Sequence, residues 1–465
     1  MTCNVEDSFA CIKQIKAFRG SLFEKVAEKN KNVIWNQATL AEVKKIIIIL
    51  SASRSGSSLM FSTLREIPEL YSLSGESSPY FKVHGFYSDT ALSDYVSPAA
   101  LDDDLARAAV SRDFLSDFSV PENADAVLYE KEVLEEYVRD LLLRFPLQWP
   151  QLSFSLEGLE STIRKAFEKY KKSCTSFVTE DFYLELLLFL RSQYKEINPY
   201  YYDISEYKIR KKFPQVAISN SPPCEILSIE EPPFILLSPR KKVQAQDLAE
   251  KVLLLKTPAD CYRLPFIAAL FPNAMIKYIY LTRNPAASIN GLYDGWQHRG
   301  FFSYNLKLAT SSSEREALQI IGYSDLYEWG KWWWKYDLPP NWQHYVNHSL
   351  ERVCAFQWKS AHKHIQEHIK QGKKPVLFVS YEDFIKSYNS RCSILEAICA
   401  FIEIDVATLN NVELQTLPLV QVTRAPKRYR WKKRAQQLLP VLKDPEMGKI
   451  CSFLGYNFEE KGNWI

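Results

Sequence analysis

A run of five apolar residues that passes directly into a loop of small residues is the feature that most constrains how this chain can fold. Residues 46–50 are four isoleucines and a leucine, and a short run of this kind is typical of a strand buried inside a parallel sheet. Residues 51–56 are mostly serine, alanine and glycine, and residues 57–64 return to a helical pattern. A strand, a small-residue loop and a helix in this order predict one unit of an α/β domain.

Three further apolar runs have the same arrangement. Residues 252–255, 276–281 and 376–379 are each followed by a polar turn and then by helical periodicity. Repeated units of this kind predict an α/β fold with a central parallel sheet and flanking helices. Ligands of such sheets bind at the carboxyl ends of the strands, which is where the polar turns are expected to lie.

Long insertions separate these units and define the expected domain organisation. Residues 1–43 are predicted to form an N-terminal helical segment, and residues 44–86 and 250–465 the α/β core. Residues 87–249 form an insertion that is charged, aromatic and mostly helical in pattern, and residues 299–348 hold a cluster of tryptophans. We expect the insertions to cap the strand ends and shape an acceptor site; a helical interaction subdomain is the alternative.

Composition argues against several classes of protein. The net charge of +3 disfavours a nucleic-acid partner, because such proteins usually carry a strongly basic face. The nine cysteines are scattered without CxxC spacing, so no metal site is predicted and reduced thiols in a cytoplasmic protein are expected. The N-terminal residues include Glu6 and Asp7 and lack an apolar core, and no apolar run is long enough for a membrane span.

The loop after the first predicted strand has the residues of an anion site. Its small residues allow the backbone to wrap a phosphate, and the next helix directs free N–H groups toward the same anion. Ser57 and Ser58 add hydroxyl donors, and Arg54 adds a permanently charged, planar guanidinium. The loop lacks the Gly-Lys-Ser/Thr ending of a nucleoside-triphosphate loop. An ordinary polar turn between a strand and a helix is the alternative interpretation.

Two more motifs follow later strands. Arg283 ends the strand predicted over residues 276–281, next to a helix start, where an arginine is placed to bind an anion; a surface salt bridge is the alternative. Glu382 and Asp383 lie in the first turn of a helix and complement its dipole, so we interpret them as structural. The basic residues of 424–434 either contact a cofactor or form a solvated face.

Together, these motifs resemble those of the sulfotransferases that use 3′-phosphoadenosine 5′-phosphosulfate (PAPS). Residues 54–58, Arg-Ser-Gly-Ser-Ser, match the phosphosulfate loop of that family. Residues 283–285, Arg-Asn-Pro, and 381–383, Tyr-Glu-Asp, match its two later motifs in the same order. The resemblance covers residues 44–86, 250–298 and 349–434, and it implies the P-loop NTPase-like sulfotransferase fold with large helical insertions.

The resemblance implies PAPS as the sulfuryl donor, with no metal. It also implies that Arg283 binds the 3′-phosphate, and that Ser288 or Asn290 assists, because the family's next serine is replaced here by Gly291. The basic C-terminal stretch is expected to close over the donor. The candidate donor-binding residues are Ser53, Arg54, Ser55, Gly56, Ser57, Ser58, Arg283, Ser288, Asn290, Lys427, Arg428 and Trp431.

The implied reaction is in-line transfer of the sulfuryl group to a hydroxyl or amine of a small molecule, carbohydrate or peptide. Arg54 and Lys256 are the cations expected to stabilise the leaving phosphate. Glu76 is the expected general base, returned toward the loop by one helix, because Pro258 stands where other family members have a histidine. His84 and His298 are the reserve bases, and His362, His364 and His368 are expected to be solvated because they lie in a polar helical pattern. A P-loop phosphotransferase and a non-catalytic binding scaffold are the alternatives.

Overall fold

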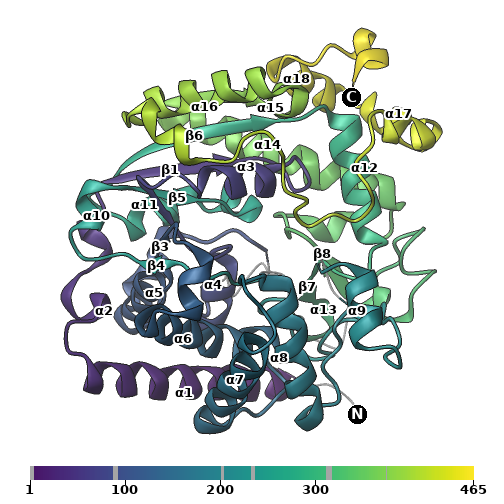
Figure 1. The fold of residues 1–465 in the computed structure, drawn as a ribbon. Coiled ribbons are helices and arrows are strands. Elements are labelled where there is room, and N and C mark those ends of the chain that lie inside the picture. Colours follow the sequence, from purple (N-terminus) through teal and green to yellow (C-terminus); the bar gives the residue numbers. More distant parts are fainter. Residues whose placement is uncertain are drawn as a thin grey trace.

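The apolar runs of the sequence form four consecutive parallel strands of a seven-stranded sheet in the computed structural model (Figure 1). The structure describes residues 5–86, 93–200, 204–231, 236–309, 317–372 and 374–464. The four strands expected from the sequence are β1 (Lys45–Leu50), β5 (Val252–Leu255), β6 (Met275–Thr282) and β9 (Val376–Ser380). The sheet order is β4-β3-β2-β5-β1-β6-β9, so β1 is central and pairs in parallel with β5 and β6. The α/β fold class is therefore confirmed.

Three short strands extend the sheet on the β5 side and were not predicted. They are β2 (Leu70–Ser72), which is parallel to β5, and the antiparallel strands β3 (Ser119–Val120) and β4 (Lys241–Lys242). Two or three residues are too few to show a period in the sequence. Pairing with an existing sheet edge defines these strands, and β3 and β4 belong to the insertion of residues 87–249.

Both faces of β1 are covered, as a continuous isoleucine run requires. Ile46, Ile48 and Leu50 pack into one apolar cluster, and Ile47 and Ile49 pack into another on the opposite face. The helices that contribute to the first cluster include α11 (Leu264–Leu270), α12 (Pro285–Trp296) and α14 (Leu350–Gly372). Those of the second are α3 (Ser57–Leu64), α15 (Tyr381–Lys386) and α16 (Tyr388–Ile402). Alternate side chains of one strand thus join two separate cores.

A third apolar cluster joins the N-terminal helix to the first insertion. Its members include Leu22, Leu141, Ile163 and Leu186. They lie on α1 (Val5–Lys29), α6 (Lys131–Gln148), α7 (Leu156–Lys171) and α8 (Thr179–Gln193). In Figure 1 these helices lie below the sheet. The helical insertions expected with the fold class are confirmed, and residues 5–29 of the N-terminal segment form α1.

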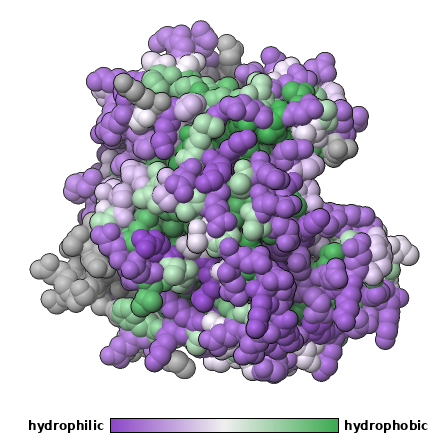
Figure 2. All heavy atoms as spheres, turned by 90° about the vertical axis from the view of Figure 1, so that its left-hand side faces the viewer, coloured by the Kyte–Doolittle hydropathy of each residue, from purple (hydrophilic) through white to green (hydrophobic). Residues whose placement is uncertain are grey.

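The remaining elements connect these layers. They are α2 (Ile34–Gln37), α4 (Ser78–His84), α5 (Asp104–Asp117), α9 (Glu206–Lys212), α10 (Asp247–Glu250), α13 (Leu306–Ala309), α17 (Ala435–Leu442) and α18 (Pro445–Phe453). In the tryptophan-rich insertion, β7 (Phe302–Asn305) pairs with β8 (Trp333–Lys335). The face shown in Figure 2 is mainly hydrophilic, with apolar side chains gathered in patches. No helix in the described ranges is long and apolar enough to cross a membrane.

The histidines of α14 correct one expectation. His362, His364 and His368 lie in a polar pattern and are predicted to be solvated, which is wrong for His362, because its side chain is fully buried. Its Nδ1 lies 2.7 Å from the Tyr280 hydroxyl on β6, and burial lowers its pKa to about 3. The physical reason is the helical period, which turns His362 toward the sheet together with its apolar neighbours.

Gly56 occupies a backbone position that excludes other residues. Its φ is +95°, and a Cβ built on it would lie 2.2 Å from the Tyr381 ring. Gly455, after α18, has a similar φ of +81° but open space around it. Left-handed strain costs about 1–2 kcal/mol, and overpacking typically adds about 1–3 kcal/mol.

We therefore expect Gly56→Ala to lower the free energy of unfolding by at least about 1 kcal/mol more than Gly455→Ala does. Urea denaturation of both variants measures the difference. Equal losses would contradict the close approach of the Tyr381 ring to Gly56.

Candidate functional site

The loop between β1 and α3 forms one wall of a cavity of about 440 Å³. Arg54 and Gly56 both have positive φ, of 66° and 95°, which turns the loop tightly around the start of α3. Ser53 and Ser57 are buried, and Ser58 is half-buried. Ser53, Arg54, Gly56, Ser57 and Ser58 all line the cavity. The small-residue loop therefore borders a space that an anion could enter.

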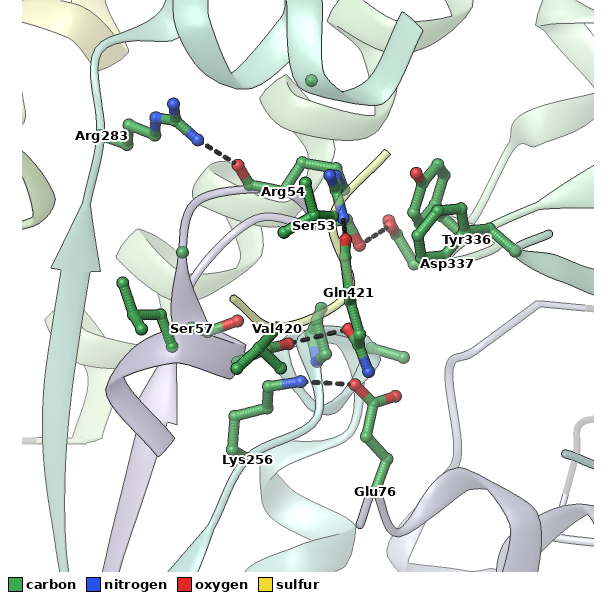
Figure 3. Close-up of a pocket in the computed structure, with 18 of the residues that line it drawn as sticks. Ser53, Arg54, Ser57, Glu76, Lys256, Arg283, Tyr336, Asp337, Val420 and Gln421 are labelled. Carbon is green, nitrogen blue, oxygen red and sulfur yellow. Dashed lines mark hydrogen bonds and ion pairs between the residues drawn. The ribbon is translucent and has the colours of Figure 1, made fainter. Parts of the chain in front are cut away.

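Side chains from neighbouring strand ends converge on the same cavity (Figure 3). Glu76 follows β2, Lys256 follows β5 and Arg283 follows β6. The Lys256 ammonium donates to Glu76 Oε1 at 2.6 Å, and only 4% of the lysine side chain and 21% of the glutamate side chain are exposed. Glu76 returns to the loop through strand β2 as well as α3, where a helix alone was expected. The carboxyl edge of the parallel sheet thus gathers these groups, as its topology requires.

Arg54 is held by a segment near the C-terminus. Its guanidinium donates to the Gln421 carbonyl at 2.9 Å and to Thr423 Oγ1 at 3.4 Å, and it lies over the Phe301 ring, 5.1 Å from the centroid. Ser58 Oγ donates to Gln421 Oε1 at 3.0 Å. Figure 3 shows Gln421 between Arg54 and the Lys256–Glu76 pair. Nothing in the sequence pattern indicated Gln421, since it is a single polar residue in an irregular segment.

Arg283 lies beside the loop backbone. Its Nη1 donates to the Arg54 carbonyl at 3.0 Å, and its guanidinium is 4.5 Å from the centroid of the Tyr381 ring. A Cβ built on Gly291 would lie 3.2 Å from Arg54 Cβ, so a side chain at this position would press on the loop. This close approach is a physical reason for glycine where the resemblance leads one to expect serine.

The two residues proposed in its place have different surroundings. Ser288 is fully buried and its Oγ lies 3.3 Å from Ser55 Oγ; the described residues that line the cavity include neither serine. Asn290 does line the cavity, but its Oδ1 accepts from Arg434 at 2.6 Å and its amide group donates to Asp294 at 3.3 Å. Their roles as phosphate ligands stay predictions.

The basic C-terminal stretch is anchored by one buried carboxylate. Asp294, on α12, pairs with Arg430 and Arg434 at 2.7 Å and with Arg424 at 3.7 Å. Burial lowers the pKa of Arg430, and the nearby Arg283 and Arg54 add to this effect. Lys427 and Arg428 are exposed and line the cavity. Trp431 also lines it, but its ring is buried and its indole N–H donates to the Trp464 carbonyl at 2.9 Å, so it packs against the core.

The cavity is also lined by buried acids and a lysine that no sequence motif indicated. Asp337 accepts from Ser53 Oγ at 2.6 Å and from the Tyr262 hydroxyl at 2.8 Å, and burial raises its pKa to about 6. Burial also raises the pKa of Glu231 to about 8 and lowers that of Lys82 to about 8. These residues are far apart in the sequence and follow no motif.

The reserve bases lie elsewhere. His84 Nε2 is 2.8 Å from Asp113 Oδ2, between α4 and α5. Burial lowers the pKa of His298 to about 3, and the neighbouring Lys335 and Arg299 act in the same direction. Of the residues described, the cavity lining contains neither histidine. Within the described ranges, no group of three or more His, Cys, Asp or Glu side chains could hold a metal ion.

The fold and the cavity define an α/β protein with a cationic site at the carboxyl edge of its sheet. No protein-family model matches the chain, and no curated protein matches its sequence. Solved structures that resemble it include the sulfotransferase domain from the curacin biosynthetic pathway, with 15% identity over 89% of this chain and 98% of that one, at a TM-score of 0.31.

Two further structures resemble the chain. Sulfotransferase STF9 from Mycobacterium avium has 10% identity over 94% of this chain and 82% of that one, at a TM-score of 0.35. A sulfotransferase from Alicyclobacillus acidocaldarius has 10% identity over 90% and 98% of the two chains, at a TM-score of 0.31. At these TM-scores the similarities are distant, so a function has to rest on the chemistry of the cavity.

Asp337 generates a prediction about pH and stability. Its folded-state pKa of about 6 lies above its ordinary value of 3.8. The folded protein therefore binds this proton more tightly than the unfolded chain does, and the resulting stabilisation is present below pH 4 and lost as the pH rises through 6.

Relative to Asp337→Asn, the wild type should lose on the order of 2–3 kcal/mol of unfolding free energy between pH 4 and pH 7. Urea unfolding of both proteins across this range measures the difference. A difference that does not change with pH would contradict the burial of an ionisable Asp337.

Proposed function

We propose that this protein is a sulfotransferase that uses PAPS as its sulfuryl donor and a hydroxyl or amine as acceptor. The observation that carries the proposal is the convergence of Arg54, Lys256, Arg283 and the N-terminus of α3 on one cavity that also contains Glu76. The donor set fits a nucleotide with two separate anionic groups: it has backbone N–H groups, serine hydroxyls and three cationic side chains. PAPS, when bound, supplies an activated sulfuryl group with 3′,5′-bisphosphoadenosine as the leaving group.

The loop side of the cavity would hold the phosphosulfate. Ser57, Ser58 and the free N–H groups of α3 can donate to its oxygens, and Arg54 and Lys256 can stabilise charge on the leaving phosphate. In the present structure Gln421 accepts from Arg54 and Ser58. Nucleotide binding therefore requires Gln421 to give up these donors. A sulfuryl group carries less negative charge than a phosphoryl group, so protein cations can suffice.

Arg283 would bind the 3′-phosphate, and Lys427 and Arg428, which also line the cavity, would add positive charge. Arg283 is held at the Arg54 carbonyl and against the Tyr381 ring, so its guanidinium is already oriented. Arg430 lies close enough to Arg283 and Arg54 for their charges to lower its pKa. A cationic cluster of this kind favours an anion with more than one phosphate.

Glu76 would act as the general base. Its carboxylate would take the proton of the acceptor as the new bond to sulfur forms and the bond from sulfur to the phosphate oxygen breaks. Lys256 donates to Glu76 and lies at the end of β5, between the carboxylate and the loop. A shift of the ammonium toward an incoming phosphate oxygen would free Glu76 to accept the proton.

The two insertions would form the acceptor side. Segment 228–231 of the first insertion and segment 301–304 of the second both line the cavity. We propose that residues 87–249 cap this side, that the acceptor is a small molecule, carbohydrate or peptide, and that the protein acts in the cytoplasm. Aromatic residues such as Phe302 and Tyr304 offer flat surfaces to an acceptor.

Sulfuryl transfer can be tested directly with sulfur-labelled PAPS and a panel of phenol, sugar and peptide acceptors. Transfer should survive EDTA, since protein cations are proposed to stabilise the leaving phosphate. Activity that requires magnesium and a nucleoside triphosphate would instead identify a phosphotransferase. Tight binding of PAPS without turnover on any acceptor would favour a binding scaffold.

Nucleotide affinity tests the role of Arg283. Charge-assisted hydrogen bonds contribute about 1.5–3 kcal/mol, so 3′,5′-bisphosphoadenosine should bind about tenfold or more tightly than adenosine 5′-phosphate in calorimetry. Arg283→Ala should bring the two affinities close together while changing that of adenosine 5′-phosphate little. Equal affinities in the wild type would contradict the assignment.

Glu76→Gln tests the base. The substitution keeps the size and hydrogen bonding of the side chain and removes the basic oxygen, so turnover should fall by roughly 10² to 10⁴. Affinity for 3′,5′-bisphosphoadenosine should stay nearly constant. Normal turnover in Glu76→Gln together with an inactive His84→Ala or His298→Ala would transfer the role to a histidine.

A further inference from the structure

The short loop that carries Glu76 is held on both sides by buried polar groups. On its C-terminal side, the Ser77 N–H donates to Thr257 Oγ1 at 2.9 Å, and Ser77 Oγ donates to Asp260 at 3.0 Å. Arg263 donates to Ser78 Oγ at 2.8 Å and pairs with Asp260 at 2.8 Å. All these partners follow β5, so this side of the loop is fixed by the α/β core itself.

On the N-terminal side, the partner belongs to the insertion. The Ser74 N–H donates to Asp117 Oδ2 at 3.0 Å, and Ser74 Oγ donates to Asp117 Oδ1 at 2.5 Å. Asp117 is the last residue of α5 and is 7% exposed. The Asp117 carboxylate therefore accepts hydrogen bonds from both the backbone and the side chain of Ser74, two positions before Glu76.

Arg144 connects Asp117 to Glu230, a residue that lines the cavity. Its guanidinium, on α6, is 3% exposed; Nη2 donates to Asp117 at 3.3 Å and to the Tyr80 hydroxyl at 3.2 Å, and Nη1 donates to Glu230 at 2.5 Å. Glu230 lines the cavity and accepts a second bond from Gln148 at 2.8 Å. A continuous chain of buried contacts thus runs from the cavity wall to the loop of Glu76.

The chemistry of these buried contacts indicates that Arg144 fixes geometry more than it stabilises the fold. A buried ion pair adds little net stability, because the cost of removing the charges from water offsets their attraction. A guanidinium nevertheless fixes its partners in direction, because its donors lie in one rigid plane. One arginine that contacts Asp117, Tyr80 and Glu230 sets the relative positions of the insertion and the loop.

We propose that Arg144 is a positioning residue for the reaction. Through Asp117 and Ser74, it places Glu76 relative to the residues on the acceptor side of the cavity. This inference rests on the proposed function. It assigns to the first insertion a part in catalysis beyond covering the cavity, because the position of α6 then determines the position of Glu76. Small displacements of a reacting group are costly, and about 1 Å can reduce turnover by roughly 100-fold.

The test uses Arg144→Lys, which keeps the charge and removes the planar fork, with Arg391→Lys as the matched control. Arg391, on α16, is 5% exposed and donates to the Leu414 carbonyl, and its helix packs in the apolar cluster that holds Ile47 and Ile49, away from the contacts to Ser74. Arg144→Lys should lower kcat roughly 10- to 100-fold with unchanged affinity for 3′,5′-bisphosphoadenosine. It should also speed hydrogen exchange of residues 74–78. Arg391→Lys should do neither.

Two further variants separate positioning from general loosening. In a Glu76→Gln background, Arg144→Lys should cause no further loss of kcat, because the arginine acts through the glutamate. Ser74→Ala removes one hydrogen bond to Asp117 at a small cost in packing. It should show the same changes in hydrogen exchange and kcat, and it replaces Arg144→Lys in the test if that variant does not fold. Additive losses in the double variant, or equal losses of kcat and nucleotide affinity, would overturn the proposal.

Hydrogen exchange does not depend on the reaction, so the two proposals fail separately. If the wild type transfers no sulfuryl group while Arg144→Lys still loosens residues 74–78, the proposed function is wrong and the structural coupling stands. If the wild type is active and Arg144→Lys changes neither exchange nor kcat, the proposed function stands and Arg144 has no positioning role.

Discussion

The convergence of cationic side chains on one edge of a parallel sheet is the constraint on which the rest of this structure depends. Arg54, Lys256 and Arg283 reach the same cavity because they follow adjacent strands. Each of these three side chains contacts a partner within the chain. Lys256 pairs with Glu76, Arg54 donates to the Gln421 carbonyl, and Arg283 donates to the Arg54 carbonyl. These partners are the groups that an incoming anion would displace or lie beside.

Other residues that line the cavity are ionisable groups buried away from water. Glu231 and Asp337 are acids with raised pKa values, and Lys82 is a base with a lowered one, all because of burial. Each keeps specific hydrogen bonds: Lys82, for example, donates to the Ser228 and Ser303 carbonyls at 3.0 and 2.8 Å. Raised acid pKa values and a lowered lysine pKa bring the neutral forms of these groups closer in free energy, which limits the cost of burying charge. The cavity lining thus combines polar contacts with aromatic surfaces.

Much of the core and part of the site could be predicted from the sequence. The four longer strands, the loop of residues 51–56 and the placement of Lys256 and Arg283 at strand ends follow from local patterns. The short strands β2 to β4 could not be predicted, because they exist only through pairing with a neighbour. His362 was misjudged because a polar residue can be buried when a tyrosine supplies its hydrogen bond.

The sequence by itself determined the α/β architecture and the chemical character of the loop of residues 51–56, because both depend on interactions between residues close in the chain. Only the tertiary structure decided which distant residues complete the cavity. Asp337 meets Ser53 across 284 positions, and Gln421 meets Ser58 across 363. Such contacts leave no period or spacing in the sequence. They arise where separately folded segments pack together, and each buried polar group must then bind whichever partner the packing brings within reach.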